Sequence, residues 1–444
     1  IFGFSVHKNL FFADTIFEVK FMRDFLEIEK VRALEVLDSR GNPTVQVEVV
    51  TDGGFSAKAI APSGASTGKF EALELRDGDK DRFRGKGVCK AVKNVNLKLS
   101  RLLEGQNVYD QWKIDNEMIM LDDTEDKSNI GANAMIATSM AVARVASRSL
   151  GMPLYMYIGG LNANRLPIPR LNILNGGKHA YNNLSIQEFM IVPKREDSFI
   201  DVMEKCTRVY NTLRNILTIK GFNVGVGDEG GFAPNLDTDE DAIKYILDAI
   251  IKSGFEPGKD FHIALDVAAT EMKDEAVKIA KEGYLFWKTD NYKSPEEMIE
   301  YLKDLIDRYP IISIEDGLAE EDWKMWERFQ SEVGNKIMTV GDDLYVTNPQ
   351  RLLKGIKCKS SNSILIKPNQ IGTISETLGT VKLARSAGMK VIVSHRSGET
   401  EDTFISDLAV GVGADYIKTG APARTDRVAK YNRLLNIENE IKGL

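Results

Sequence analysis

The stretch Ile311-Ile-Ser-Ile-Glu-Asp-Gly317 decides the fold. It is a short apolar run rich in β-branched residues, it ends at a glycine, and it is too short to cross a membrane. Such a run is typical of a strand that is buried on both faces, as in a parallel sheet. Because its last side chains are acidic, we predict a buried strand that carries Glu315 at its C-terminal end.

The same pattern recurs through the second half of the chain, where apolar runs at 262–266, 337–342, 363–367, 391–395 and 416–418 each end in one ionisable residue. Segments of helical period lie between them. One begins with Ser294 as a cap, Pro295 as first residue and Glu297 closing a capping box. Most of the strand ends are roughly 23 to 28 residues apart, which is typical of a closed (β/α) barrel.

Functional residues of such barrels lie at the C-terminal ends of the strands. A single charge there usually does no more than face solvent at the rim, but six in register are hard to explain in that way. We therefore expect one mouth of the barrel to gather Asp266, Glu315, Asp342, Lys367, His395 and Lys418.

Length and composition limit the class of protein. The 444 residues allow two domains, since a barrel of about 250 residues counts as one. With 43% hydrophobic residues the chain can bury a large core, and its net charge of −7 offers no basic surface for nucleic acid. The most apolar of the long segments, 130–145, is rich in Ala and Met and predicts a buried helix rather than a membrane span.

Cysteine usage points to a reducing compartment. Cys89, Cys206 and Cys358 are too few and too scattered for a disulfide framework or a zinc site. We therefore expect a cytoplasmic protein.

The first third of the chain has a different organisation. Residues 1–26 are apolar and aromatic but lack the features of a signal or transit peptide. We therefore interpret them as residues added for expression or translated from upstream sequence, or as disordered chain. Alternating Val45, Val47 and Val49 predict a strand, and Asp52-Gly-Gly54 predicts a hairpin turn. Helical periodicity over 86–150 completes an α+β domain at 27–165, and prolines at 162–169 mark a linker to a barrel at 166–444.

Three familiar motifs are present but incomplete. Gly64-Ala-Ser-Thr-Gly68 resembles a nucleophile elbow, yet the sequence continues as polar residues and no suitable histidine is near. The same stretch is one residue short of a P-loop. Gly225-Val-Gly-Asp-Glu-Gly230 spells a dinucleotide fingerprint, but Gly231-Phe-Ala-Pro234 follows where a helix should open. We interpret it as a glycine-rich loop that presents Asp228 and Glu229.

The ionisable residues at the strand ends favour particular chemistry. Asp266, Glu315 and Asp342 offer only oxygen ligands, which suits Mg²⁺ and leaves coordination positions for a substrate. A lysine held near other cations, as Lys367 or Lys418 would be, has a lowered pKa and can act as a general base. His179 and His395 each lie in a glycine-flanked context, which gives a functional role about even odds against a structural one.

Several long motifs together resemble the enolase family, and the resemblance runs from about residue 28 to 444. They are Asp38-Ser-Arg-Gly-Asn-Pro-Thr44, Pro62-Ser-Gly-Ala-Ser-Thr-Gly68, Glu71-Ala-Leu-Glu-Leu-Arg-Asp-Gly78, Gln187-Glu-Phe-Met190, Gly227-Asp-Glu-Gly-Gly231, Ser313-Ile-Glu-Asp-Gly317, Ile366-Lys-Pro-Asn369, Ser394-His-Arg-Ser-Gly-Glu-Thr400 and Lys418-Thr-Gly-Ala-Pro422. The lead before about residue 28 has no counterpart in the family.

The resemblance implies a reaction and a fold. The reaction is the reversible dehydration of 2-phospho-D-glycerate to phosphoenolpyruvate in glycolysis and gluconeogenesis, with two Mg²⁺ ions. Removing the proton beside the substrate carboxylate creates a dianion that only concentrated positive charge can stabilise. The fold would be α/β, a (β/α)8-type barrel with atypical opening strands preceded by an α+β N-terminal capping domain.

The resemblance also implies a role for each site residue. Lys367 would accept the C2 proton, while Glu229, helped by Glu188, would protonate the leaving 3-hydroxyl. The first Mg²⁺ would bind Asp266, Glu315 and Asp342, and Ser66 in its loop would join the second Mg²⁺, which is recruited with substrate. The remaining substrate contacts would come from His179, Glu188, His395, Arg396, Ser397 and Lys418.

Other functions stay open at this point. Another superfamily member, such as an acid-sugar dehydratase or racemase, would also remove a proton beside a carboxylate, but Glu188, Glu229 and the phosphate stretch 394–397 argue against it. A surface-displayed or secreted binding role, or a structural protein with a decayed site, belongs to a different class. The family implies a homodimer or a larger even homo-oligomer with small-molecule substrates, no nucleic acid and no membrane span.

Overall fold

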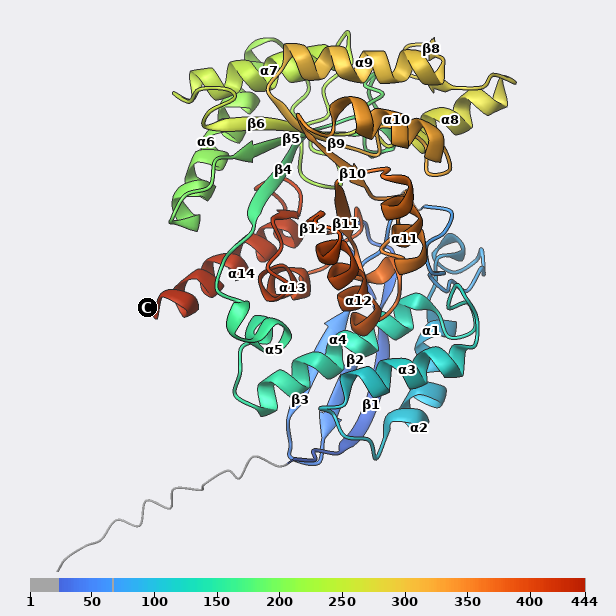
Figure 1. Cartoon of the computed structure of the whole chain (residues 1–444). Coiled ribbons are helices and arrows are strands. Elements are labelled where there is room, and N and C mark those ends of the chain that lie inside the picture. The colour runs from blue at the N-terminus through green and yellow to red at the C-terminus, as the bar shows by residue number, and fades with distance from the viewer. Residues whose placement is uncertain (1–23, 66–67, 444) are drawn as a thin grey trace, which may run out of the picture.

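The structure is a computed structural model that describes residues 24–65 and 68–443 (Figure 1). Its N-terminal part contains an antiparallel sheet of β1 (Ile28–Leu37), β2 (Pro43–Thr51) and β3 (Ser56–Ile60), with β2 in the centre. The predicted strand residues Val45, Val47 and Val49 are all fully buried. The β2–β3 turn closes through the Gly54 amide, which donates to the Thr51 carbonyl at 2.9 Å.

Helices cover one face of this sheet. The longest, α4 (Ala132–Ser149), packs against β2 and β3, and nearly all of its residues are buried. This confirms the helix predicted over 130–145. The other helical elements here are α1 (Cys89–Asn94), the π-helical turn η2 (Val95–Leu99), α2 (Ser100–Leu103), α3 (Gln111–Asp122), α5 (Leu154–Gly159), and the 3₁₀ turns η1 (Phe83–Gly85) and η3 (Gly160–Asn162).

The C-terminal part is a closed eight-stranded barrel with strand order β10-β11-β12-β13-β4-β5-β6-β9. All neighbours are parallel except that β5 runs antiparallel to both β4 and β6. The expected barrel with atypical opening strands is therefore confirmed. Its strands are β4 (Ile168–Asn175), β5 (Glu188–Pro193), β6 (Phe261–Asp266), β9 (Ile311–Glu315), β10 (Met338–Gly341), β11 (Ser363–Ile366), β12 (Lys390–Ser394) and β13 (Tyr416–Lys418).

Helices form the outer layer of the barrel (Figure 1). The predicted capping box at the start of α9 is present, with the Glu297 amide donating to Ser294 Oγ and the Ser294 amide donating to the Glu297 carboxylate. The helices are α6 (Phe199–Ile219), α7 (Asp239–Lys252), α8 (Ala269–Lys278), α9 (Pro295–Arg308), α10 (Trp323–Val333), α11 (Pro349–Cys358), α12 (Ile374–Ser386), α13 (Phe404–Gly411) and α14 (Thr425–Lys442). A hairpin of β7 (Tyr284–Phe286) and β8 (Asn291–Lys293) and the 3₁₀ turns η4 (Gly177–His179) and η5 (Pro368–Gln370) complete the barrel part. No described helix combines the length and apolarity that a membrane span requires.

The N-terminal part lies against the mouth of the barrel where the strands end. The loop after β12 pairs with it, because the Ser63 and Gly398 amides exchange hydrogen bonds at 2.8 Å and the Ser39 amide donates to the Glu399 carbonyl. Leu26, which the sequence assigned to the leader, is 3% exposed and packs in the N-terminal core. Residues 1–23 of that leader lie outside the described residues.

Two sequence predictions concern loops. The stretch 225–230 opens no helix, as predicted, and the next helix begins only at Asp239. The linker predicted over 162–169 is wrong at its end, because Pro169 already lies inside β4. A proline is tolerated there because β5 pairs with β4 only from Leu171 onwards, so at Pro169 the strand has one neighbour, β13, and needs fewer amide donors.

Candidate active site

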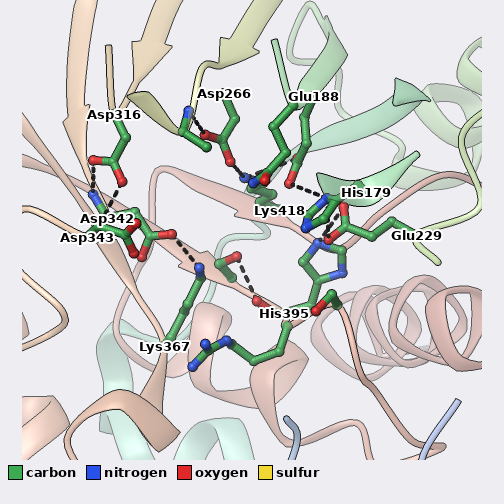
Figure 2. A pocket seen from close by; sticks show the side chains of 15 residues that line it. His179, Glu188, Glu229, Asp266, Asp316, Asp342, Asp343, Lys367, His395 and Lys418 are labelled. Carbon is green, nitrogen blue, oxygen red and sulfur yellow. Dashed lines mark hydrogen bonds and ion pairs between the residues drawn. The ribbon is translucent and has the colours of Figure 1, made fainter. Parts of the chain in front are cut away.

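A tight polar cavity lies at the C-terminal mouth of the barrel (Figure 2). Most of the residues predicted from the strand ends line it, and Glu315 lies beside them, in contact with Lys418. The predicted metal ligand Ser66 lies outside the described residues. The lining residues are His179, Gln187, Glu188, Glu229, Asp266, Ala268, Asp316, Asp342, Asp343, Lys367, Ser394, His395, Arg396, Ser397 and Lys418.

Strand register explains why the acids meet. Glu188 on β5 pairs with Asp266 on β6, and Asp266 pairs with Glu315 on β9. Residues in register on adjacent strands have neighbouring side chains, so three carboxylates form a row across three strands. Because β5 is antiparallel, Glu188 reaches this mouth from the first residue of its strand rather than from the last.

The Lys418 ammonium lies within this row of acids. Its Nζ donates to Asp266 at 2.8 Å and to Glu315 at 2.7 Å, and it lies 3.1 Å from Glu188. Burial lowers the pKa of Lys418, but the charges of the three carboxylates outweigh burial and raise that pKa well above its usual value. In this structure Lys418 is therefore a fixed cation.

Lys367 projects into the same cavity and forms an ion pair with Asp342 (Figure 2). Burial and the nearby charges of Arg396 and Lys418 lower its pKa, but Asp342 offsets them and the net direction is upward. The sequence-based expectation of a lowered pKa is thus wrong for this structure. The physical reason is that a carboxylate lies closer to the ammonium than the other cations do.

A second group of acids lies near His179. The His179 Nδ1 atom is 3.7 Å from a carboxylate oxygen of Glu188 and 3.7 Å from one of Glu229. Burial and the charge of Glu229 raise the pKa of Glu188 well above its usual value. Burial also opposes charge on Glu229, but the neighbouring histidines and Arg427 lower the pKa of Glu229 well below its usual range. These opposite pKa shifts favour a proton on Glu188 over a proton on Glu229.

His395 has a defined tautomer. Arg427 donates to its Nδ1 at 2.5 Å, so Nδ1 is the acceptor and the proton is on Nε2, which faces Glu229 at 3.4 Å. Burial lowers the pKa of His395 to about 3, so the ring is neutral at neutral pH. It therefore stabilises the Glu229 carboxylate through its N–H dipole rather than through a full charge. Sequence reasoning did not identify Arg427, which is separated from His395 by a strand and a helix.

The stretch after β12 already has partners. The buried Arg396 guanidinium donates to the Glu71 carboxylate at 2.8 and 3.0 Å and to Asn369 at 3.2 Å. Ser397 Oγ accepts a hydrogen bond from the Ala65 amide at 2.6 Å. Two residues proposed for a phosphate group are thus in contact with the N-terminal part of the chain.

The acids of the mouth fit a divalent cation. Glu315 Oε2 is buried without a hydrogen-bond partner, and burial together with the Asp266 charge raises the pKa of Glu315 to about 8. Both features indicate a deficit of positive charge that a cation with oxygen ligands would correct. Among the described residues, the all-carboxylate group with oxygens within 4.8 Å of one another is Asp316, Asp342 and Asp343.

Asp316 and Asp343 were not predicted as site residues, although each directly follows a predicted ligand. Asp316 accepts hydrogen bonds from the backbone amides of Asp342 and Asp343, at 2.9 and 2.7 Å. It therefore holds the loop that presents Asp342. Adjacency in sequence was the only signal that could have indicated either residue.

A closed barrel that gathers buried carboxylates, two lysines and two histidines at its C-terminal mouth defines a barrel protein equipped for acid–base chemistry. Comparison with known families gives the particular family. Residues 163–443 match the model described as enolase, C-terminal TIM barrel domain, and residues 28–158 match enolase, N-terminal domain. The chain belongs to the enolase family, a family of generally Mg²⁺-dependent lyases.

Proposed function

We propose that this protein catalyses the reversible dehydration of 2-phospho-D-glycerate to phosphoenolpyruvate. The observation that carries the proposal is that one cavity contains both a lysine able to act as base and a carboxyl pair able to act as acid. Lys367 enters it from the end of β11, and Glu188 and Glu229 enter it from β5 and the glycine-rich loop. Membership of the enolase family supports the same reaction.

Lys367 is the proposed base for the C2 proton, and to accept that proton it must be neutral. The ion pair with Asp342 is what keeps its pKa high, whereas Arg396 and Lys418 favour the neutral amine. Asp266, Glu315 and Asp342 would hold one Mg²⁺ and Ser66 would join a second, and these ions would supply positive charge for the substrate carboxylate. The Asp342 carboxylate would then be shared with the metal and would raise the pKa of Lys367 less. The charges of Arg396 and Lys418 would then lower the pKa of Lys367.

Glu229 is the proposed acid for the 3-hydroxyl group, with Glu188 as its proton source. The opposite pKa shifts of the two groups favour a proton on Glu188 over a proton on Glu229. A proton must therefore pass from Glu188 to Glu229 and on to the 3-hydroxyl oxygen, or from Glu188 directly to that oxygen, so that the hydroxyl group leaves as water. His179 lies 3.7 Å from both carboxylates and is placed to orient them, and Lys418 holds the other side of Glu188.

Arg396 and Ser397 are the proposed phosphate ligands, beside His395. In the structure the Arg396 guanidinium forms an ion pair with Glu71. A phosphate dianion must therefore displace the Glu71 carboxylate or share the guanidinium with it. Guanidinium groups bind phosphate in the same two-pronged geometry as carboxylate, so the exchange keeps the hydrogen bonds of Arg396.

Isotope exchange separates the two halves of this mechanism. Lys367→Ala should lose exchange of the C2 proton with solvent deuterium, whereas Glu229→Gln should keep that exchange and lose dehydration. Each change should cost on the order of a hundredfold or more in the step that it affects. Lys252→Ala, an exposed lysine on α7, is the matched control and should behave as wild type. Wild-type exchange in Lys367→Ala would refute the assignment of the base.

A further inference from the structure

The opposite end of the barrel, where the strands begin, contains an open hollow of about 590 Å³. We call it the basal hollow. Its walls come from residues at the starts of several strands, Ile168, His262, Met338 and Tyr416, and from the end of β5, which reaches this side because it runs antiparallel to its neighbours. Its volume lies within the range of about 300–1,000 Å³ that is usual for small-molecule sites.

All the fully charged side chains that line the basal hollow are basic, although the chain as a whole has a net charge of −7. They are Lys194, Arg195, Lys336 and Lys390. Burial lowers the pKa of His262, which also lines the hollow, so this histidine is neutral at neutral pH. The side walls between these charges are apolar, and include Ile168, Val192, Ile312 and Tyr416.

Acids neutralise only part of this charge. Lys336 pairs with Asp307 at 2.8 Å and Lys390 pairs with Asp415 at 3.1 Å. Arg195 donates to the Leu166 carbonyl, which carries no charge, and burial and nearby Arg165 lower its pKa. Among the described residues, no hydrogen bond or ion pair engages the Lys194 ammonium. The charge of Asp415 also acts on Arg195 but offsets burial and Arg165 only in part, so the Lys194–Arg195 side keeps a net positive charge.

A buried arginine beneath the floor of the basal hollow is a second sign of excess positive charge, independent of the side chains that line the hollow. Arg170 is 0% exposed, and its Nε and Nη1 atoms have no hydrogen-bond partner. Its guanidinium carbon lies 4.4 Å from the centre of the Tyr416 ring, and Nη2 contacts the sulfur of Met338 at 3.5 Å. Tyr416 and Met338 both line the basal hollow. Burial lowers the pKa of Arg170, and the nearby charges of Glu315 and Asp415 offset burial only in part, so the charge of this buried guanidinium is incompletely compensated.

We propose that the basal hollow binds a small organic anion, with its phosphate or carboxylate group at the Lys194–Arg195 side above Arg170 and its apolar body against the walls. The head group would lie over Met338 and Tyr416, the layer that separates the hollow from Arg170. This ligand would compensate the charge of Arg170 through space and that of Lys194 and Arg195 by direct contact. The site lies at the opposite end of the barrel from the proposed active site and does not depend on the reaction proposed there.

Phenyl phosphate, which joins a phosphate dianion to an apolar ring, is the probe for this site. Isothermal titration calorimetry should show binding to wild type, about tenfold weaker binding to Lys194→Ala/Arg195→Ala, and several-fold weaker binding to Arg170→Met. Arg396→Ala removes the proposed phosphate ligand of the active site and should leave one binding event of wild-type affinity. Inorganic phosphate, which lacks the apolar ring, should bind this site more weakly than phenyl phosphate.

Two results would overturn the proposal. Binding that survives in the Lys194/Arg195 variant and disappears in Arg396→Ala would assign the anion to the active site. No binding to wild type at millimolar phenyl phosphate would mean that the basal hollow takes no such ligand. The surface double variant replaces exposed side chains only, so its result decides the question even if Arg170→Met fails to fold. Turnover in the double variant should equal that of wild type, which separates this site from catalysis.

Discussion

Lys418→Met should destabilise the metal-free protein strongly and be partly rescued by Mg²⁺. The Lys418 ammonium lies 2.7–3.1 Å from three buried carboxylates. At an effective dielectric constant of about 20, one such pair is worth on the order of 5 kcal/mol before desolvation. Measured losses from breaking a buried pair are about 3–5 kcal/mol, so we expect the melting temperature to fall by about 3–5 °C in EDTA.

The loss should grow with pH. Glu188 and Glu315 already have raised pKa values, about 8 for Glu315, and removing the neighbouring cation raises both further. A carboxyl group whose pKa is higher in the folded state binds more protons folded than unfolded, so stability falls as pH rises from its unfolded pKa through its folded pKa. Thermal unfolding followed by circular dichroism should therefore show both proteins losing stability as pH rises above about 5, and the variant diverging further from wild type as pH approaches and passes about 8, where Glu315 ionises in folded wild type but not in the folded variant.

Lys430→Met is the matched control. Lys430 is also fully buried and pairs with Glu399 at 2.8 Å, away from the row of Glu188, Asp266 and Glu315. It should lose a similar amount of stability, and because Mg²⁺ should stabilise it only as much as wild type, its deficit relative to wild type should remain in Mg²⁺. For Lys418→Met, a free Mg²⁺ concentration of 100 times its dissociation constant should restore about 2.7 kcal/mol. Equal melting temperatures of Lys418→Met and wild type in EDTA at pH 8, or equal rescue of both variants, would refute the reasoning.

Three further predictions concern the metal, the buried Asp239 and the oligomeric state. Excess chelator should abolish phosphoenolpyruvate formation measured spectrophotometrically, because clustered carboxylates repel one another until a divalent ion neutralises them; full turnover in EDTA would contradict the metal assignment. Burial raises the pKa of Asp239 from 3.8 to about 6, so this group should cost the folded state about 3 kcal/mol as pH rises from 4 to 7, and Asp239→Asn should flatten that part of the stability–pH profile. Light scattering should give a dimer or larger even assembly, as the family resemblance implies, and a monomer mass at micromolar concentration would contradict it.

The sequence alone determined the repeat of the barrel and the ends of its strands. The runs that end in Asp266, Glu315, Lys367 and Lys418 are all strands of the barrel, because a buried parallel strand needs a continuous apolar run and its polar end must reach solvent or a site. The capping box at Ser294 and the helix α4 followed from local patterns for the same reason. Long motifs identified the family before any distance was known.

Only the tertiary structure decided how these residues interact. Periodicity does not give the direction of a strand, so the reversed β5, which brings Glu188 to the active mouth, followed from the family and not from the pattern. The raised pKa of Lys367 depends on whether a carboxylate or a cation lies nearest, and that is set by closure of the barrel. Two further long-range outcomes are Arg427 beside His395 and the buried Arg170, whose Nε and Nη1 atoms have no hydrogen-bond partner. Burial and charge environment depend on neighbours that are far apart in the chain.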